Sequence, residues 1–371
     1  MKVSNLDIYL KNIDYMITFI MRGRLKRIPV LLDSNISKLY LQYKNETDPK
    51  IKCGTGASIL NAYENNPWVM LRLKSNCAVE DMRLFMKHHK DRTLIDKSPS
   101  KPDDYYSVAV IVKNEARYIK EFILFYQSTG ADRIYIYDNE STDGLSEVLE
   151  PFINAGQVVY KKWPGNKVQT AAYRDAVRRT RKRTKWLALV DADEFLFPVE
   201  GDMKTLLKEY EEYPGIGVNW RMFGPNGHDK RPEGLVMDNY TECIANEDEV
   251  INQHIKSIVQ PSRVALVNHV HFAMYKNKQY AVDENKVIID NTCAHAPSAG
   301  KAFTPTTNGR IFRINHYNTR SLEDLREKCE RGYPDGTPKG TVESFIRTFD
   351  RPLKYDYSIK RFADIVRESI G

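Results

Sequence analysis

Four short apolar runs between residues 107 and 190 alternate with three amphipathic stretches, and this alternation is the clearest pattern in the chain. The runs are rich in Val, Ile and aromatic residues, as buried strands are. They cover residues 107–112, 133–138, 157–163 and 186–190, and the amphipathic stretches between them cover 114–130, 141–156 and 168–184. Strands that alternate with helices at this spacing form βαβ units. The pattern therefore predicts an α/β fold with a mainly parallel, Rossmann-like sheet flanked by helices.

Polar side chains follow these predicted strands at their carboxyl ends, the edge where such sheets bind ligands. We expect them to gather at one edge and to contact a nucleotide: Lys113, Asn114, Glu115, Asp138, Asn139, Trp163, Asp191, Asp193 and Glu194. At the end of the fourth strand, Asp191 and Asp193 can point the same way and offer hard oxygen ligands to Mn²⁺ or Mg²⁺. A solvated loop or a helix N-cap is the alternative, but the position after a strand of a βαβ series favours a metal site.

Other nucleotide-binding classes lack their motifs here. Neither GxGxxG nor GxxxxGK[ST] follows any of the four strands, which disfavours dinucleotide binding and a P-loop. Phe195 stands where a haloacid-dehalogenase phosphatase would have Thr or Val, and the acidic motif follows the fourth strand rather than the first. A sugar nucleotidyltransferase, or a non-catalytic membrane-associated scaffold with the same fold, stays open as an alternative to a transferase.

The rest of the chain lacks this regular alternation. Residues 1–104 show no strand pattern and indicate a mainly helical extension. Later elements are predicted as a helix from Met203, a strand at 215–224, a loop rich in Gly and Pro at 225–234 and a helix at 321–332. The predicted parts are thus the extension at 1–104, an α/β domain at 105–335 and a partly helical tail at 336–371.

Composition narrows the class of partner. The net charge of +7 points to anionic partners in general. The basic run at 178–185 ends a predicted helix, where cations complement the dipole, and an anionic membrane surface is the alternative. Nucleic acid is disfavoured because no motif that reads bases accompanies the charge.

Cysteine usage and hydropathy bear on location. The five cysteines form no CxxC pair, which disfavours disulfides and zinc and indicates a cytoplasmic protein. The best apolar run near the start, residues 15–21, is too short to span a bilayer. We expect a protein that is either free in the cytoplasm or attached peripherally to the inner face of the cell membrane.

Five motifs, taken in order, resemble glycosyltransferase family 92 and its bacterial family-2-like relatives. They are the run from Val108 to Gly144, YRDA at 173–176, DADEF at 191–195, FGPNGH at 223–228 and NHYNTRSLEDLREKCERG at 315–332. The resemblance covers residues 105–335. It implies a GT-A fold and metal-assisted transfer of a sugar from a nucleotide-sugar to an acceptor hydroxyl, with inversion favoured. We expect a UDP-sugar as donor, a glycan or lipid-linked saccharide as acceptor, and surface polysaccharide synthesis as the setting.

The resemblance also implies roles for individual residues. Glu115 and Asp138 match positions expected to hold the nucleoside, and Asp191 would face the ribose or the metal. Asp193 would bind the metal, with His316 as a further ligand. Other donor contacts are expected, by their place in family-like segments, from Lys113, Asn114, Asn139, Arg174, Lys256 and Arg331. Helix capping and solvated salt bridges are the alternatives.

Transfer with inversion requires a general base for the acceptor proton. The candidates lie in or after the loop at 225–234: His228 and Asp229, with Asp238 and Glu242 behind them. A plain surface position is the alternative for each. His269 and His271 could also chelate a metal as an i, i+2 pair if their segment is a strand, but His316 is preferred because it matches the family.

Overall fold

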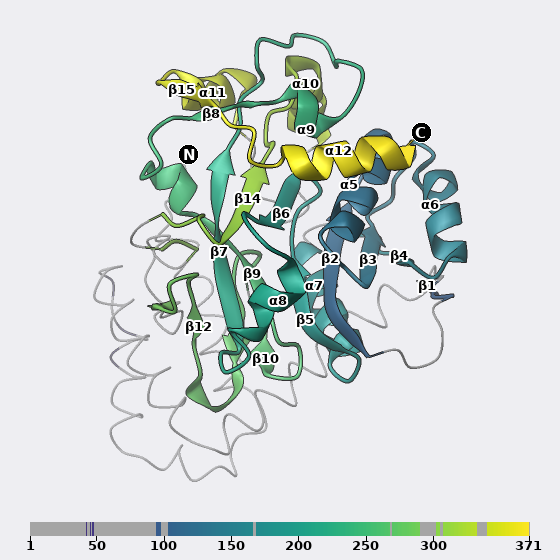
Figure 1. The fold of residues 1–371 in the computed structure, drawn as a ribbon, viewed down its shortest axis with the longest axis vertical. Helices are drawn as coiled ribbons and strands as arrows, with labels where there is room; N and C mark the ends of the chain where they lie inside the picture. The colour runs from purple at the N-terminus through teal and green to yellow at the C-terminus, as the bar shows by residue number, and fades with distance from the viewer. Residues whose placement is uncertain are drawn as a thin grey trace. The chain divides into compact units, whose positions relative to one another are not determined.

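A computed structural model of the chain describes most of residues 94–370 (Figure 1). The described ranges are 94–97, 103–165, 168–267, 269–289, 302–304, 307–331 and 340–370, with the isolated residues Gln42, Asn45 and Thr47. The chain divides into two compact units, residues 1–83 with 292–300, and residues 84–291 with 301–371. The predicted helical extension therefore lies almost wholly outside the described residues.

Four parallel strands form the centre of the sheet, in the order β4-β3-β2-β5. They are β2 (Asp104–Val112), β3 (Arg133–Asp138), β4 (Val158–Lys162) and β5 (Thr184–Leu189). Each coincides with one of the four apolar runs. The predicted α/β class with a parallel core is thus confirmed.

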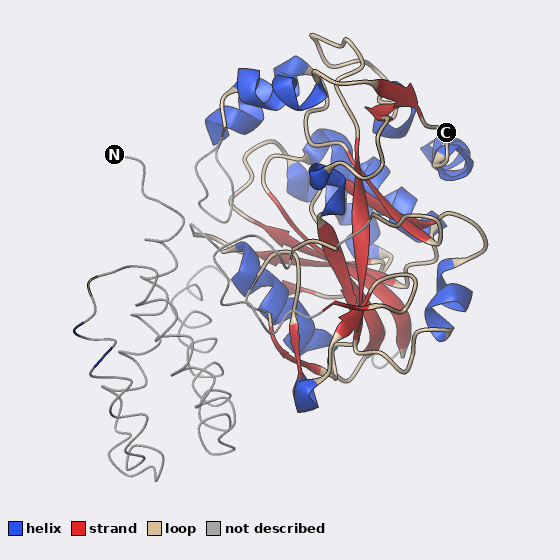
Figure 2. Cartoon of the chain, turned by 90° about the vertical axis from the view of Figure 1, so that its left-hand side faces the viewer, coloured by secondary structure: helices blue, strands red, loops and turns tan. Residues whose placement is uncertain are grey.

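Helices cover both faces of these strands (Figure 2). Alternate residues of β2 serve different faces, because successive side chains of a strand point in opposite directions. Val110 packs in the cluster that includes α5 (Ala116–Ser128) and α6 (Leu145–Asn154). Its neighbour Ile111 packs in the second cluster, with α7 (Gln169–Thr180). An unbroken apolar run is what a strand needs when both of its faces are buried.

The third helix ends earlier than predicted. The sequence favours a helix to Thr184, but α7 ends at Thr180. Thr184 instead begins β5 and pairs with Asp104 of β2. The backbone N–H of Asp104 donates to Arg183 O at 2.8 Å. Arg and Lys are good helix formers, so local propensity is overridden here by strand pairing. The basic run therefore spans a helix end, a turn and the start of a strand.

Antiparallel strands extend the sheet beyond β5. β9 (Ile255–Val259) pairs antiparallel with β5 and with β7 (Gly215–Met222). β14 (Phe312–His316) then runs parallel to β7 and antiparallel to β6 (Glu194–Pro198). In this register His316 pairs with Glu194, so a residue near the end of the domain lies beside the acidic motif that follows β5.

The remaining described elements are short. The strands are β1 (Leu94–Ile95), β8 (Glu242–Ile244), β10 (Val264–Leu266), β11 (Met274–Tyr275), β12 (Ala281–Val282), β13 (Ile288–Ile289) and β15 (Leu353–Tyr355). The helices are α8 (Met203–Lys208), α9 (Val236–Asn239), α10 (Leu322–Arg331), α11 (Val342–Ile346) and α12 (Lys360–Ile370), with short 3₁₀ turns at 250–253, 276–278 and 347–349.

The last helix packs on the α/β core. α12 lies alongside α5 (Figure 1) and buries Phe362, Ala363 and Val366. The ring of Phe362 meets that of Phe125 edge-on, with 5.7 Å between centroids. Among the helices of the described residues, none combines the length and the apolar character needed to cross a bilayer.

Glu121 is a buried carboxyl group on α5 that should make stability depend on pH. Its two oxygens accept hydrogen bonds from the backbone N–H groups of Val236 (2.8 Å) and Met237 (3.1 Å) at the start of α9. Burial raises the pKa of Glu121 from 4.5 to about 7, although those two bonds act to lower it. Between these values the folded protein binds more protons than the unfolded chain, so raising the pH favours unfolding.

We therefore expect the free energy of unfolding contributed by Glu121 to be fully present below pH 4.5 and to fall as pH rises to 7. The loss should be roughly 2–3 kcal/mol. Urea unfolding across this range measures it, and Glu121→Gln, which cannot titrate, is the comparison. Parallel pH profiles for the two proteins would show that Glu121 titrates normally in the fold.

Candidate active site

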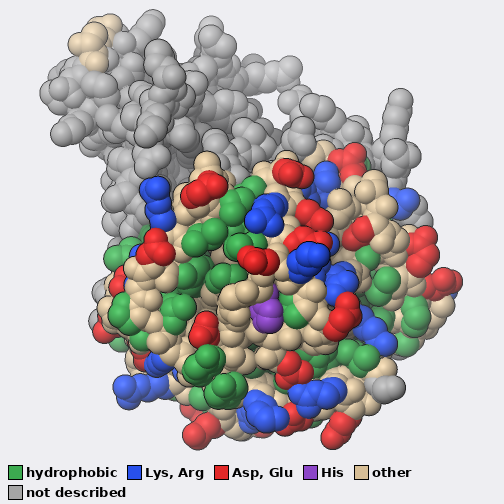
Figure 3. Space-filling model, turned by 90° about the horizontal axis from the view of Figure 1, so that it is seen from above, with side chains coloured by type: hydrophobic (Ala, Val, Ile, Leu, Met, Phe, Trp, Pro, Cys, Tyr) green, Lys and Arg blue, Asp and Glu red, His purple; other side chains and the backbone are tan. Residues whose placement is uncertain are grey.

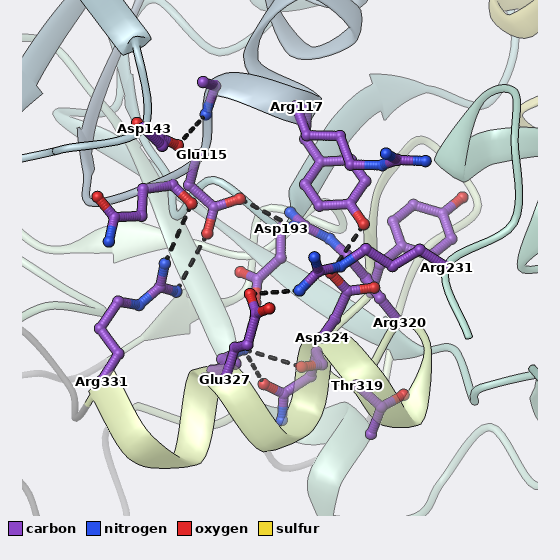
Figure 4. A pocket seen from close by; sticks show the side chains of 16 residues that line it. Glu115, Arg117, Asp143, Asp193, Arg231, Thr319, Arg320, Asp324, Glu327 and Arg331 are labelled. Carbon is purple, nitrogen blue, oxygen red and sulfur yellow. Dashed lines mark hydrogen bonds and ion pairs between the residues drawn. The ribbon is translucent and has the colours of Figure 1, made fainter. Parts of the chain in front are cut away.

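A cavity of about 330 Å³ lies beside the end of β2 and one face of α10 (Figure 4). Its walls come from segments that are far apart in the sequence, and many of its side chains are charged. The charged lining residues are Glu115, Arg117, Asp143, Asp193, Arg231, Arg320, Asp324, Glu327, Lys328 and Arg331. On the end of the molecule that carries α10, side chains of both charges lie intermixed (Figure 3). Such a cavity is suited to a polar, charged ligand.

α10 presents one face to the cavity because of the spacing of its lining residues. Asp324, Glu327, Lys328 and Arg331 are related as i, i+3, i+4 and i+7, which places them on one side of a helix. The helix start is capped reciprocally, since Ser321 Oγ accepts from the Asp324 N–H at 3.1 Å and Asp324 Oδ2 accepts from the Ser321 N–H at 3.3 Å. This cap fixes where the face begins.

The loop at 225–234 completes the cap. The N–H groups of Leu322 and Glu323 donate to the backbone oxygens of His228 and Asp229, both at 3.0 Å. These are two of the first-turn N–H groups that have no partner within a helix. The two candidate bases thus contribute backbone atoms to the position of α10.

Glu115 is the buried centre of one half of the cavity. Its carboxylate accepts from Arg320 Nη1 at 2.8 Å and from Arg331 Nη2 at 3.1 Å. Figure 4 shows Arg331 reaching up from α10 to Glu115. Arg320 also donates to Ala192 O at 3.2 Å and lies over the Tyr118 ring, 4.0 Å from its centroid. One arginine therefore joins the end of β2 to the acidic motif.

Asp193 is the centre of the other half. Its Oδ2 accepts from Lys328 Nζ at 2.5 Å, and its Oδ1 lies 3.5 Å from His316 Nε2. Burial by itself would raise the pKa of Asp193, but Lys328, His316 and Arg320 outweigh burial and hold it well below its usual value. Asp193 is therefore a carboxylate at every pH at which the protein is expected to work.

Asp191 has a different set of partners. Its Oδ1 accepts from Gln169 Nε2 (2.5 Å), Tyr173 OH (2.9 Å) and Lys256 Nζ (2.8 Å). Burial would lower the pKa of Lys256, but Asp191 and Glu194 raise it, so the ammonium stays charged. The Asp191 side chain is one-third exposed and does not line the cavity.

The two aspartates diverge because the motif is not extended. β5 ends at Leu189, and residues 191–193 form a turn closed by the Glu194 N–H, which donates to Asp191 O at 3.1 Å. The rule that residues i and i+2 share a face holds for strands and does not apply in this turn. Among the described residues, no three of His, Cys, Asp or Glu come together as a metal-binding group.

Several other residues predicted to bind the donor contact neighbouring parts of the protein instead of lining the cavity. Asp138 accepts from Tyr160 OH at 2.5 Å, and Asn139 Nδ2 donates to Trp163 O at 2.9 Å. Arg174 Nε donates to Val267 O at 2.6 Å. Lys113 contributes its backbone oxygen, which accepts from Arg331. Of the predicted donor-binding set, Asn114, Glu115 and Arg331 line the cavity.

The four predicted bases, and the histidine pair that was the alternative metal site, also lie outside the cavity lining. Asp229 is exposed, His228 Nε2 is 3.2 Å from Asn239 O, and Asp238 pairs with the guanidinium of Arg367 at 2.8 Å. Glu242 begins β8. The segment of His269 and His271 is not a strand, and His271 Nδ1 lies 2.9 Å from Ile255 O. The roles predicted for these residues stay predictions.

Sequence reasoning missed most of the cavity-facing side of α10 and its surroundings. Arg320 and Lys328 belong to the motif at 315–332, yet neither was assigned a role. Arg231 was missed as well, and its Nε donates to Asp324 Oδ1 at 2.7 Å. The i, i+3, i+4, i+7 spacing of charged residues on a predicted helix was the available signal. Charged residues at that spacing are more often a solvated face, so the pattern alone does not identify a site.

The fold and the cavity define an α/β protein with a charged ligand site at the carboxyl edge of a parallel sheet. The model of Glycosyltransferase family 92 matches residues 105–331, and the chain belongs to this family. A family 92 protein of Oryza sativa subsp. japonica is 34% identical over 268 residues, which are 69% of this chain and 44% of that protein. One of Ricinus communis is 26% identical over 296 residues, which are 76% of this chain and 48% of that protein.

The matched region spans less than half the length of these two relatives. Both are plant proteins, so they give no support to the bacterial setting predicted from the motifs. Similarity to solved structures is low. Staphylococcus aureus TarS 1-349 in complex with UDP-GlcNAc has a TM-score of 0.29 and 17% identity, covering 43% of this chain and 46% of that one. The mannosyltransferase PcManGT of Pyrobaculum calidifontis, in complex with GDP-Man and Mn²⁺, has a TM-score of 0.26 and 14% identity, covering 41% and 46%.

Proposed function

We propose that this protein transfers a sugar from a UDP-sugar to a hydroxyl group of a saccharide or lipid-linked saccharide, with inversion at the anomeric carbon. Membership of glycosyltransferase family 92 supports sugar transfer. The carrying observation is the cavity, in which Asp193 lies among the cationic side chains of Arg320, Lys328 and Arg331. Behind it, His316 Nε2 lies 3.5 Å from Asp193 Oδ1. A nucleoside diphosphate presents the negative charge that such cations recognise.

We propose a Mn²⁺ or Mg²⁺ ion as cofactor, held by Asp193 and His316. A carboxylate and an imidazole are ligands that Mn²⁺ accepts, whereas Mg²⁺ prefers oxygen alone, so the donor set favours Mn²⁺. His316 Nε2 is the nitrogen that faces Asp193, at 3.5 Å from Oδ1, and would be the ligand atom. Its Nδ1 is buried and has no hydrogen-bond partner among the described residues. When bound, the ion would supply electrophilic stabilisation of the departing diphosphate. Asp191, turned to Lys256 and Tyr173, is the proposed partner of the ribose instead.

The protein's own cations contribute to the same step. As the acceptor oxygen attacks, the bond between the anomeric carbon and the donor phosphate oxygen breaks, and negative charge collects on the diphosphate. Arg320 and Arg331, already fixed by Glu115, are oriented to receive that charge without reorganising. The acceptor proton passes to a general base, for which His228 and Asp229 remain the proposed candidates. A cytoplasmic location, with peripheral contact to an anionic membrane for lipid-linked acceptors, completes the proposal.

Titration of the full chain with UDP, with and without Mn²⁺, tests this proposal directly. We expect UDP binding that strengthens at least about tenfold when Mn²⁺ is present, because ion and diphosphate neutralise each other. A panel of UDP-sugars should then show metal-stimulated release of UDP from one of them. If the affinity for UDP is the same with and without Mn²⁺, and no UDP-sugar is turned over, the scaffold alternative is favoured. Formation of a UDP-sugar from UTP and a sugar phosphate would favour the nucleotidyltransferase.

A further inference from the structure

Lys328 lines the cavity, and its ammonium group is surrounded by oxygen atoms. Its Nζ donates to Asp193 Oδ2 at 2.5 Å, to Asn318 O at 2.9 Å and to Asn318 Oδ1 at 2.5 Å. Carboxylate, backbone carbonyl and side-chain amide oxygens are the ligands that hard divalent cations take in proteins. The lysine therefore sits among oxygens that would suit a metal ion.

Asp193 is shared between this lysine and His316. Oδ2 of the carboxylate faces Lys328, while Oδ1 lies 3.5 Å from His316 Nε2. Both side chains are largely buried, with 16% of Lys328 and 7% of His316 exposed. A cation held jointly by Asp193 and His316 would meet the ammonium at close range, in a site where little water screens the two positive charges.

We infer that Lys328 occupies the cation position in the free protein and that a divalent ion must displace it to bind Asp193. This inference rests on the proposed function. The displaced ammonium stays on the cavity-facing side of α10, one turn from Arg331, where a diphosphate offers it new oxygen partners. Without nucleotide, the two acidic residues on this side of α10, Asp324 and Glu327, are already paired with Arg231 and offer the displaced lysine less than a diphosphate would. Metal and nucleotide should therefore strengthen each other's binding through Lys328, as linkage requires.

The test is the affinity of the full chain for Mn²⁺ alone, measured from the electron paramagnetic resonance signal of the free ion. Lys328→Met removes the competing ammonium, and we expect Mn²⁺ to bind about tenfold more tightly than to the wild type, a change of about 1.4 kcal/mol. In the same variant, UDP should increase Mn²⁺ affinity less than it does in the wild type. Circular dichroism checks the fold, and Lys328→Gln replaces the methionine variant if that one does not fold.

Arg331→Met is the matched control. It removes an equal charge from the same helix and the same cavity but leaves the oxygens around Lys328 unchanged, so Mn²⁺ affinity should change by less than about threefold. If Mn²⁺ affinity rises equally in both variants, the effect comes from net charge alone, and the inference is overturned. The inference would also be overturned if the Lys328 variants bound Mn²⁺ no more tightly than the wild type does, while the Asp193→Ala variant bound none. That result would leave the proposed metal site standing. Absence of Mn²⁺ binding in every protein, even with UDP, would remove the metal site and this inference together.

Discussion

Asp193→Ala is expected to lower kcat/KM for sugar transfer by about 10²–10³-fold. The substitution removes the carboxylate that lies between Lys328 and His316, and with it the proposed metal ligand. Charge that develops on the diphosphate would then be met by Arg320, Lys328 and Arg331 without the ion. Initial rates with the donor identified by the UDP-sugar panel measure the effect, at saturating and limiting Mn²⁺.

Glu330→Ala provides the comparison, because Glu330 is an exposed acidic residue of α10 outside the cavity lining. Its rate should match that of the wild type. UDP binding without metal should survive in the Asp193 variant, since Arg320 and Arg331 keep their partner Glu115. If the rate of the Asp193→Ala variant lies within about threefold of the wild-type rate, Asp193 is not an electrostatic group at the reacting centre, because loss of such a group costs far more.

Arg320→Ala is expected to lower the free energy of unfolding by about 3 kcal/mol, because it breaks a buried ion pair with Glu115. Arg320 also binds Ala192 O, so its loss frees the turn that carries Asp193. Arg320 thus has a positioning role besides its proposed contact with the diphosphate, and kcat/KM should fall by about 10²-fold as Asp193 is misplaced and this cation is lost. Urea unfolding and initial rates measure the two effects.

Two further variants separate charge from geometry at this position. Arg320→Lys keeps the positive charge but lacks the planar fork that reaches Glu115 and Ala192 together, so it should recover much of the stability and little of the rate. Arg326→Ala removes an exposed arginine of α10 that does not line the cavity, and should change neither quantity. Full recovery of rate in Arg320→Lys would show that charge alone, without positioning, is what Arg320 contributes.

Much of the fold could be predicted because it depends on local pattern. β2, β3, β4 and β5 are buried on both faces, and strands of that kind read as unbroken apolar runs. α5 presents its stripe of Ile119, Phe122, Ile123 and Tyr126 to the sheet, as its spacing predicts. The end of α7 could not be predicted, because strand pairing at Thr184 competes there with good helix formers.

The candidate site was predicted only in outline. The acidic motif and Glu115 follow from their place at strand ends, and His316 came from the family resemblance. Which of these residues share a cavity depends on contacts across long stretches of chain. Asp193 meets Lys328 135 positions away, and Glu115 meets Arg320 205 positions away. No local periodicity encodes such pairs.

By itself, then, the sequence determined the α/β core and the edge of the sheet where charged residues gather, because burial and backbone direction repeat over a few residues. Tertiary structure alone decided that Asp191 turns to Lys256 while Asp193 turns to Lys328, and that one face of α10 closes the cavity. The physical reason is the turn at 191–193 and the packing of α10. These two features orient side chains by long-range hydrogen bonds and ion pairs, which the order of residues along the chain does not display.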